Sequence, residues 1–154
     1  MRMASLTWNL RNAFADGVAE TGGLKRLGRE LVDRLVELGV VVDLAHASPR
    51  TFADVLERTG DAPVVVSHAA CRRVHDHPRN LTDEQLRALA ERRGLLGLML
   101  HPLAIDAERR RIDRAIDHLE HAAEVMGWER LCLGGDFIRR LTALLRPHPM
   151  FGTH

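Results

Sequence analysis

The chain has 154 residues, of which 45% are hydrophobic and 28% charged, the mixture expected of a globular domain with its own core. Its 22 Lys and Arg residues nearly balance 21 Asp and Glu residues, which excludes a dedicated nucleic-acid or anionic-membrane binder, because such proteins carry a basic surplus. No apolar run approaches the ~20 residues that cross a bilayer. Two cysteines, Cys71 and Cys132, form no disulfide pattern and favour a reducing, cytoplasmic setting. We expect one domain over residues 1–154.

Five short apolar runs predict strands. They are rich in Val and Leu and do not alternate with polar residues, which is typical of parallel strands buried on both faces. Each run is followed by a loop and then by an amphipathic stretch, so the same unit recurs along the chain. In chain order the runs occupy residues 4–8, 40–45, 63–67, 95–100 and 130–134.

The amphipathic stretches carry the start and stop signals of helices. Leucines recur at helical spacing over residues 24–38, and Gly39 supplies the stop. The pair Ser48–Pro49 forms an N-cap followed by proline at the first helical position. Residues 82–85 match a capping box, which predicts the start of a helix, and Gly94 is the predicted end of that helix.

The last two predicted helices lie in the second half of the chain. Residues 106–126 form a helical pattern that ends at Gly127, and a fifth helix is expected after Phe137. On this interpretation His118 and His121 lie on the polar, exposed side of the 106–126 helix. The predicted apolar face consists of Ile112, Ile116, Leu119, Ala123 and Met126.

Strands that alternate with helices predict a parallel α/β sheet with right-handed crossovers. Two architectures fit, a doubly wound open sheet and part of a (β/α)8 barrel. The pairs Gly22–Gly23 and Gly134–Gly135 match neither G-x-G-x-x-G nor a P-loop, the motifs that would favour the open sheet. A complete barrel usually needs ~250 residues, so we expect about five units of a TIM-like barrel.

A potential ligand or acid/base group follows four consecutive predicted strands. His46, His68 and His101 each come after an apolar run, and Asp136 comes after the last one. Active sites in parallel α/β folds are built at the carboxyl ends of the strands. Histidine and aspartate are also the residues that a hydrolytic Zn²⁺ site uses. These positions predict a hydrolytic site at this edge of the sheet.

Plainer interpretations compete with a metal site. A single histidine at a strand end is more often a loop or capping residue, and Asp136 could equally cap the next helix. His75 and His77 fit a solvated loop better than a metal site. Neither H-E-x-x-H nor C-x-x-C occurs. From the residues alone, the prediction is an α/β hydrolytic enzyme whose metal dependence stays open.

Seven segments, taken together, have a recognisable pattern. The most specific is residues 77–85, HPRNLTDEQ. The others are residues 5–9, 12–17, 23–31, 42–48, 67–68 and 134–137. In this order, to about residue 140, the chain resembles the membrane dipeptidase (renal dipeptidase-like) family of zinc hydrolases.

The resemblance implies a (β/α)8-type barrel that holds two zinc ions bridged by a carboxylate and a water or hydroxide. Such enzymes hydrolyse dipeptides, including those with a D-residue at the C-terminal position. By position, His46 and His68 are similar to the two histidines that bind one zinc, and Asp136 to the acid/base carboxylate. Arg79 is similar to the arginine that pairs with the substrate carboxylate, a role that suits a guanidinium fork. His101 falls where an aromatic residue is usual, and we expect it to face the substrate.

The chain also departs from the family's pattern. The family's first zinc ligands, a His-x-Asp, and its bridging glutamate lie upstream of the matched segments. We therefore expect a barrel that is incomplete on its N-terminal side and inactive alone. Trp8 stands where several members have a histidine that polarises the scissile carbonyl.

Two alternative functions stay open. One is a non-catalytic half-barrel that needs a partner chain, and the other is a different metal-dependent amide or lactone hydrolase on the same barrel. Arg79 favours the dipeptidase, because it reads a free carboxylate. The partners that we consider are a dipeptide substrate and a second copy of the chain in a homodimer.

Overall fold

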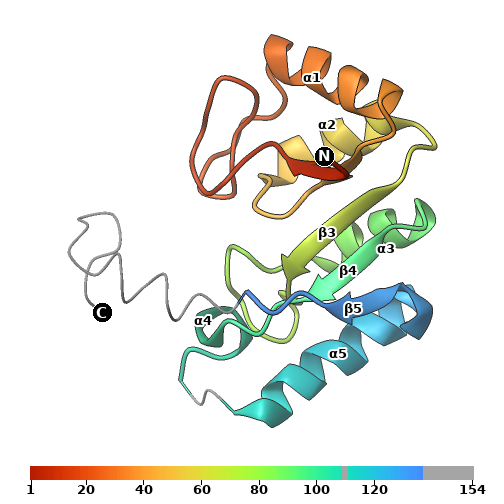
Figure 1. Cartoon of the computed structure of the whole chain (residues 1–154). Coiled ribbons are helices and arrows are strands. Elements are labelled where there is room, and N and C mark those ends of the chain that lie inside the picture. Colours follow the sequence, from red (N-terminus) through yellow and green to blue (C-terminus); the bar gives the residue numbers. More distant parts are fainter. Residues whose placement is uncertain (109–110, 137–154) are drawn as a thin grey trace.

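The computed structural model describes residues 1–108 and 111–136, which form a parallel sheet with helices packed on it (Figure 1). None of the described helices combines the length and apolar character required to span a membrane. In chain order the elements are β1 Met3–Ser5, α1 Arg26–Glu37, β2 Val41–Asp43, α2 Pro49–Thr59, β3 Val64–Ala69, α3 Asp83–Glu91, β4 Leu95–Leu98, α4 Pro102–Ile105, α5 Ile112–Met126, the 3-10 turn η1 Trp128–Arg130 and β5 Leu131–Leu133.

The described strands form one sheet in the order β1-β2-β3-β4-β5, and every adjacent pair is parallel. Strands that are consecutive in sequence are therefore neighbours in space, and the order never reverses. A doubly wound sheet reverses its strand order, whereas a (β/α) barrel keeps it. The prediction of successive units of a TIM-like barrel is confirmed, and the doubly wound alternative is excluded.

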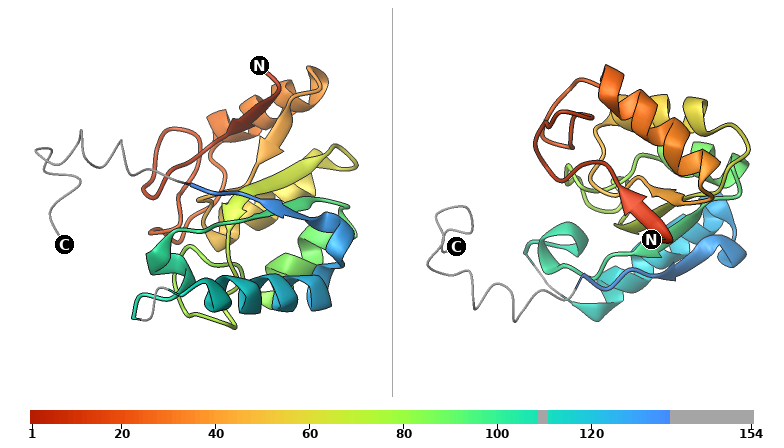
Figure 2. Two further views of the ribbon diagram at one scale, coloured as in Figure 1. Left: turned by 60° about the horizontal axis from the view of Figure 1, so that its bottom comes forward. Right: turned by 45° about the horizontal axis from the view of Figure 1, so that its top comes forward.

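The two faces of the sheet differ in what covers them. The helices pack on one face, and the other carries no described helix (Figures 1 and 2). Val42, Val64 and Leu96 point toward the helices and are buried in the main core. Met3 and Leu95 lie on the other face and are 47% and 43% exposed. Apolar residues therefore line both faces, as predicted for strands of this composition.

Local signals placed three helix ends as predicted. After α1, Gly39 has a φ of 63°, a left-handed conformation that glycine adopts without a steric cost. At the start of α2, the Ser48 hydroxyl accepts the N–H of Thr51 at 3.0 Å. At the start of α3, the Thr82 and Gln85 side chains each accept the backbone N–H of the other residue, which completes the capping box.

The helix predicted over 106–126 differs from the structure in its start and its buried face. A short helix, α4, comes first, and α5 begins only at Ile112. Ile112 and Ile116, which were expected in the core, are 76% and 49% exposed, whereas His118 is fully buried. The buried residues of α5 are Ala115, Ala122, Met126 and this histidine, whose two ring nitrogens are both hydrogen-bonded. The helix predicted after Phe137 lies outside the described residues.

The segment between β1 and α1, residues 6–25, folds over the end of β2. Gly17 and Ala47 form an isolated antiparallel bridge. The N–H of Val18 donates to the His46 carbonyl at 2.8 Å. The segment is thereby held against the loop after β2, at the edge of the sheet where the candidate site lies.

Candidate active site

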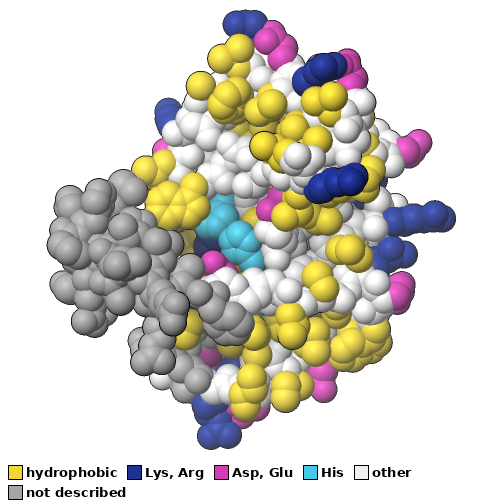
Figure 3. Space-filling view, in the orientation of Figure 1, with side chains coloured by type: hydrophobic (Ala, Val, Ile, Leu, Met, Phe, Trp, Pro, Cys, Tyr) yellow, Lys and Arg dark blue, Asp and Glu magenta, His cyan; other side chains and the backbone are white. Residues whose placement is uncertain are grey.

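The two histidines predicted as ligands meet at the carboxyl end of the sheet. His46 lies just after β2, and His68 lies within β3. Their Nε2 atoms are 2.9 Å apart, and their ring planes make an angle of 65° with centroids 4.9 Å apart. Histidine side chains form a group near the middle of the face shown in Figure 3. The structure thus brings together two residues that the strand-end pattern singled out.

His46 has a left-handed backbone conformation, with a φ of 66°, that few residues other than glycine adopt. Such a conformation costs about 1–2 kcal/mol and must be held by its surroundings. Asp43 Oδ1 accepts the N–H of Ala45 at 3.0 Å, and Val18 donates to the His46 carbonyl. The turn that these bonds hold directs the imidazole toward His68.

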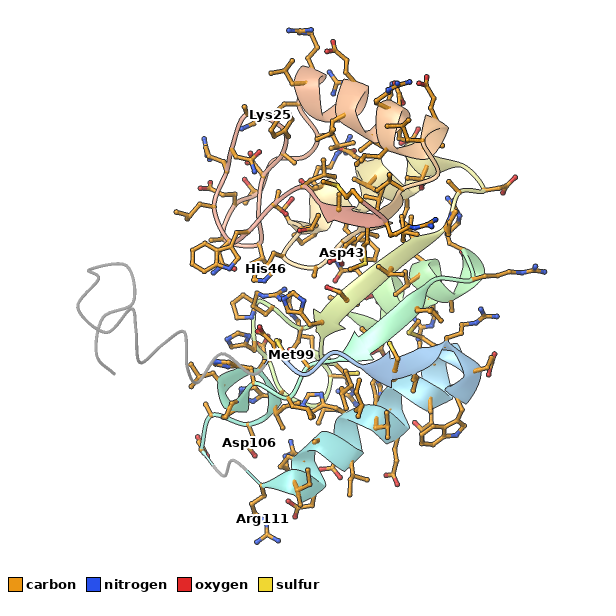
Figure 4. All side chains as sticks on the ribbon, viewed as in Figure 1. Lys25, Asp43, His46, Met99, Asp106 and Arg111 are labelled. Atoms are coloured by element: carbon orange, nitrogen blue, oxygen red, sulfur yellow. The ribbon has the colours of Figure 1, made fainter. Side chains whose placement is uncertain are left out.

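Each imidazole is also held through its Nδ1 atom. His46 Nδ1 is 2.7 Å from Asn9 Oδ1, and His68 Nδ1 is 2.8 Å from Ser67 Oγ. The Ser67 hydroxyl in turn donates to Asp43 Oδ2 at 2.6 Å. Asn9 thus holds the ring of His46, and Ser67 together with Asp43, the residue labelled beside His46 in Figure 4, holds the ring of His68.

The surroundings of the pair favour neutral imidazoles. Burial lowers the pKa of His46 to about 3, assisted by the Arg79 cation and by His68. Burial and Arg79 also lower the pKa of His68, against the opposing charges of Asp136 and Asp43. Both rings are therefore neutral at pH 7, which is the form of histidine that binds a metal ion.

Arg79 lies in the loop between β3 and α3, and its Nη2 atom donates to the His68 carbonyl at 3.2 Å. Burial lowers its pKa to about 10, although Asp136 and Asp43 oppose the change. The guanidinium therefore remains a cation at pH 7. Asn80 anchors the loop: it is 1% exposed, and its amide donates to the His75 carbonyl within the loop at 2.9 Å and to the Ala104 carbonyl of α4 at 2.7 Å.

Two glycines let the ends of β4 and β5 approach the end of β3. A Cβ atom at Gly97 would lie 2.1 Å from the Ser67 carbonyl oxygen, and one at Gly134 would lie 2.2 Å from the same atom. Both distances are far inside van der Waals contact, so these positions require glycine. The close approach brings Asp136, two residues further on, to the edge of the sheet that carries the histidines.

Asp136 completes the group of charged residues at this edge. It follows β5 and has a φ of 54°, in the left-handed region that aspartate tolerates better than most residues. Its negative charge acts on both His68 and Arg79. Four of the five residues predicted for the site are therefore linked electrostatically: Arg79 acts on His46 and His68, and Asp136 acts on His68 and Arg79.

The fifth predicted residue, His101, begins α4 and lies toward the loop that carries Arg79. Burial lowers the pKa of His77, and the charges of His75, Arg79 and His101 add to this effect. The His75 and His77 rings are stacked, with centroids 6.3 Å apart. His101 is thus near the loop that carries Arg79, and a contact with substrate stays a prediction.

Trp8 stands beside the histidine pair. Its ring centroid is 6.3 Å from that of His46, and the planes are tilted by 48°. The indole is 48% exposed, so it presents an apolar surface to solvent at the entrance of the site. A side chain of this kind can contact an apolar group of a ligand but cannot supply the imidazole expected from the family's pattern.

The donors present suit a metal ion in type but not in number. Within residues 1–108 and 111–136, no three His, Cys, Asp or Glu side chains converge on a common metal position. His46 and His68 offer two neutral nitrogen donors whose Nε2 atoms face each other. Zn²⁺ accepts such ligands and is usually four-coordinate. The two histidines therefore fit a metal ion in chemistry, and further ligands would be needed to complete its shell.

Three residues of the site escaped sequence analysis: Asn9, Asp43 and Ser67. Asp43 had a detectable signal, because it is the acidic residue inside the Val-rich run 40–45 and is only 6% exposed. Ser67 precedes His68 directly and resembles an ordinary strand residue. Asn9 lies 37 residues before the histidine that it contacts, so no local pattern could pair them.

The fold and its strand-end residues are those of a TIM-barrel-like hydrolase, with histidines, an arginine and an acid at the carboxyl ends of parallel strands. The chain belongs to the membrane dipeptidase family, peptidase family M19, whose family model matches residues 1–144. The resemblance inferred from the sequence is confirmed. The family consists of hydrolytic enzymes, and the relatives below are named as dipeptidases or a metallo peptidase.

Two relatives show the likeness in sequence and a third shows it in structure. An uncharacterized dipeptidase of Schizosaccharomyces pombe is 35% identical over 144 residues, which are 89% of this chain and 35% of that protein. Dipeptidase verJ of Clonostachys rogersoniana is 33% identical over 141 residues, which are 89% of this chain and 36% of that protein. A metallo peptidase from Rhodobacter sphaeroides, liganded with a phosphinate mimic of the dipeptide L-Ala-D-Ala, superposes with a TM-score of 0.83 and 28% identity over 97% of this chain and 50% of that one.

The chain spans about a third of the length of these two curated relatives and half of the solved structure. The matched part contains the residues discussed above. The activity and substrates of a whole enzyme are therefore matters for a proposal.

Proposed function

We propose that this chain provides the metal- and carboxylate-binding part of a zinc-dependent dipeptidase. The observation that carries the proposal is the convergence of His46, His68, Arg79 and Asp136 at one end of the sheet. The proposed substrates are dipeptides, including those with a C-terminal D-residue. The Rhodobacter sphaeroides relative, liganded with a mimic of L-Ala-D-Ala, supports this substrate class.

The proposed metal ligands are the Nε2 atoms of His46 and His68. A zinc ion held there supplies a Lewis acid and a water molecule of lowered pKa. The low pKa of His46 and the lowered pKa of His68 keep both nitrogens unprotonated and ready to bind at neutral pH. On this proposal the remaining metal ligands come from outside the described residues.

Arg79 and Asp136 have complementary proposed roles. The Arg79 guanidinium binds the free carboxylate of the dipeptide, which sets the position of the peptide bond relative to the histidines. Asp136 accepts the proton of the attacking water and delivers it to the nitrogen of the leaving amine. The two side chains act on the same edge of the sheet and on each other's charge. Their nearness therefore lets one small substrate meet both.

We further propose that the chain alone does not catalyse hydrolysis. Its sheet has one face without described helices and two edge strands, β1 and β5, whose unpaired backbone groups invite another strand. These features favour, as the second candidate function, a half-barrel that becomes active only when another chain completes it. Both candidates place the metal and the substrate carboxylate at the same residues.

Binding, rather than turnover, tests the proposal on the chain as it exists. Zinc would be titrated into the purified chain with and without a phosphinate mimic of L-Ala-D-Ala. We expect the mimic to tighten zinc binding in the wild type, because Arg79 holds its carboxylate. The Arg79→Ala variant should lose this coupling, and Arg73→Ala, a change at an exposed arginine of the same loop, should keep it. Equal coupling in both variants would contradict the proposed carboxylate site.

Turnover is measured on the same samples. We expect no hydrolysis of L-Ala-D-Ala by the chain alone. Hydrolysis that persists in His68→Ala would contradict the metal assignment, whereas hydrolysis that disappears in that variant would show that the chain needs no partner.

A further inference from the structure

The two histidines of the site are oriented alike: each ring turns one nitrogen toward the other histidine and its second nitrogen toward the surrounding protein. Their Nε2 atoms face each other, while each Nδ1 atom has a fixed hydrogen-bond partner. A neutral imidazole carries one N–H proton, on either Nδ1 or Nε2. The hydrogen-bond partner of one nitrogen determines which of the two carries it. The identity of the two Nδ1 partners therefore determines what the Nε2 atoms can bind.

The partner of His46 is the side-chain oxygen of Asn9, at 2.7 Å. An amide oxygen only accepts hydrogen bonds, so the proton of the neutral ring must lie on Nδ1. The backbone carbonyl of Asn9 accepts the N–H of Ala19 at 2.9 Å, which fixes the residue within the β1–α1 segment. Nε2 of His46 is consequently left with an unprotonated lone pair.

The partner of His68 is the hydroxyl of Ser67, at 2.8 Å. That hydroxyl has a single hydrogen, which it donates to Asp43 Oδ2 at 2.6 Å. Its oxygen can therefore only accept from His68, and the ring proton again lies on Nδ1. Asp43 is itself fixed, because its Oδ1 atom accepts the N–H groups of Ala45 and Ser67 at 3.0 and 2.9 Å.

Two unprotonated lone pairs facing each other across 2.9 Å repel in the absence of a cation. A positive ion that both can coordinate converts this repulsion into binding. We propose that Asn9 and the Asp43–Ser67 pair are positioning residues that hold His46 and His68 in the Nδ1–H tautomer and so preorganise two Nε2 donors for one divalent metal ion. The inference rests on the metal-binding part of the proposed function and assigns roles to residues outside the ligand pair.

The two arms of this arrangement are unequal. The arm of His68 ends on a carboxylate, whose charge increases the basicity of the ring through the intervening hydroxyl. The arm of His46 ends on a neutral amide, which orients the ring without adding charge. Removing an outer partner of a metal-binding histidine typically costs roughly 10- to 100-fold in metal affinity. We expect Ser67→Ala to fall near the upper end of this range and Asn9→Ala near the lower end.

Two measurements on the purified chain test the proposal. Imidazole ¹⁵N NMR of the metal-free chain reports the tautomer of each ring, and competition with a chelating dye gives the zinc affinity. We expect Nδ1–H for both histidines in the wild type. In Ser67→Ala, His68 should shift toward the Nε2–H tautomer, with a fall in zinc affinity toward 100-fold. Ser67→Thr keeps the hydroxyl, so it should retain the Nδ1–H tautomer of His68 and the zinc affinity of the wild type.

Ser5→Ala serves as the matched control, because Ser5 is an exposed serine of β1. It should change neither the tautomers nor the affinity. Urea unfolding of every variant verifies that the sheet is intact, and Asn9→Ala provides a second test if Ser67→Ala does not fold. The proposal is overturned if His68 keeps its Nδ1–H tautomer in Ser67→Ala, if zinc affinity stays within twofold of the wild type, or if the wild type binds no zinc. If the tautomers and zinc affinities are as expected but the phosphinate mimic does not tighten zinc binding, the dipeptidase proposal is contradicted and the positioning role of Asn9, Asp43 and Ser67 is not.

Discussion

Histidines are enclosed in two regions of the molecule, half-buried at the end of the sheet and fully buried in the helix layer, and the two regions use them in opposite ways. At the end of the sheet, the pair His46 and His68 directs Nε2 atoms at each other. In the helix layer, His118 accepts the N–H of Cys71 on Nδ1 at 3.0 Å, and its Nε2 atom donates to the Ile105 carbonyl at 3.0 Å. The pair carries its protons on Nδ1, whereas His118 carries its proton on Nε2. Both nitrogens of His118 are satisfied within the protein.

This difference shows what distinguishes a ligand from a structural histidine. Burial lowers the pKa of His118, as it does for His46 and His68, so a lowered pKa does not separate the two regions. The feature that distinguishes the two regions is the atom that faces Nε2 of each ring. A backbone carbonyl there completes a structural hydrogen bond, whereas a second lone pair requires a cation.

The largest expected effect is on metal binding. His68→Ala removes one of two donors, so we expect zinc binding by the chain to be lost, as measured by competition with a chelating dye. The free energy of unfolding of the metal-free chain should change by less than about 1 kcal/mol, because the substitution also removes the repulsion between the two lone pairs. Retention of zinc binding would contradict the proposal that the His46–His68 pair, unlike His118, binds the metal.

The opposite result is expected in the helix layer. His118→Ala leaves a buried N–H and a buried carbonyl without partners and opens a cavity, so the free energy of unfolding should fall by about 3 kcal/mol. The zinc affinity of the folded fraction should be unchanged. His121→Ala is the control on the same helix, since His121 is partly exposed and bonds to the Asp83 side chain. Urea unfolding followed by circular dichroism would measure both, and a loss of equal size in the two variants would contradict the structural role of His118.

The sequence predicted the features that depend on residues close together in the chain. The capping box of Thr82 and Gln85 spans one helical turn, and His46 and His68, which the structure brings together, each follow a Val-rich run closely. The parallel strand order followed from the repeated units together with the family resemblance. The capping box and the strand-end histidines are signals that lie within about ten residues, the range over which periodicity and capping operate.

The sequence could not predict contacts between distant segments. His118 was expected on the exposed side of its helix because hydrophobic periodicity counts histidine as polar. Its burial depends on Cys71, 47 residues away, and on a carbonyl before the helix begins. The face of α5 was misassigned for the same reason, since Ile112 and Ile116 form a plausible apolar stripe that the sheet does not cover. The tautomer-setting role of Asn9 was equally invisible.

A smaller effect should follow from Arg79→Lys. Lysine keeps the positive charge but cannot bind a carboxylate through two parallel N–H groups. We expect the dissociation constant of the phosphinate mimic, measured calorimetrically with zinc present, to rise by about tenfold, equivalent to about 1.4 kcal/mol. The comparison becomes sharper if zinc affinity without the mimic is unchanged, because the substrate and metal contributions are then separable. An unchanged dissociation constant would show that a point charge is sufficient.

The remaining expected effect concerns pH. His118 has a pKa below its ordinary value in the folded state, mainly because it is buried, so the unfolded chain binds a proton first as the pH falls. Its contribution to stability is present above about pH 6.5 and is lost below it, at about 1.4 kcal/mol per pH unit. The difference in unfolding free energy between the wild type and His118→Ala should therefore shrink from pH 7 to pH 5. A constant difference over this range would mean that the folded ring takes up its proton as readily as the unfolded one.

The two glycines at the ends of β4 and β5 offer a way to move the acid without altering it. Because a methyl group at Gly134 would collide with the Ser67 carbonyl, Gly134→Ala must push the end of β5 away from β3. Asp136 would move with that strand end, while its own side chain and both histidines stay chemically intact. A displacement of 1 Å at a reacting group can cost about 100-fold in rate. In an enzyme assembled on this scaffold, a position with no side chain would thus act as the spacer that sets the distance between the proton carrier and the metal.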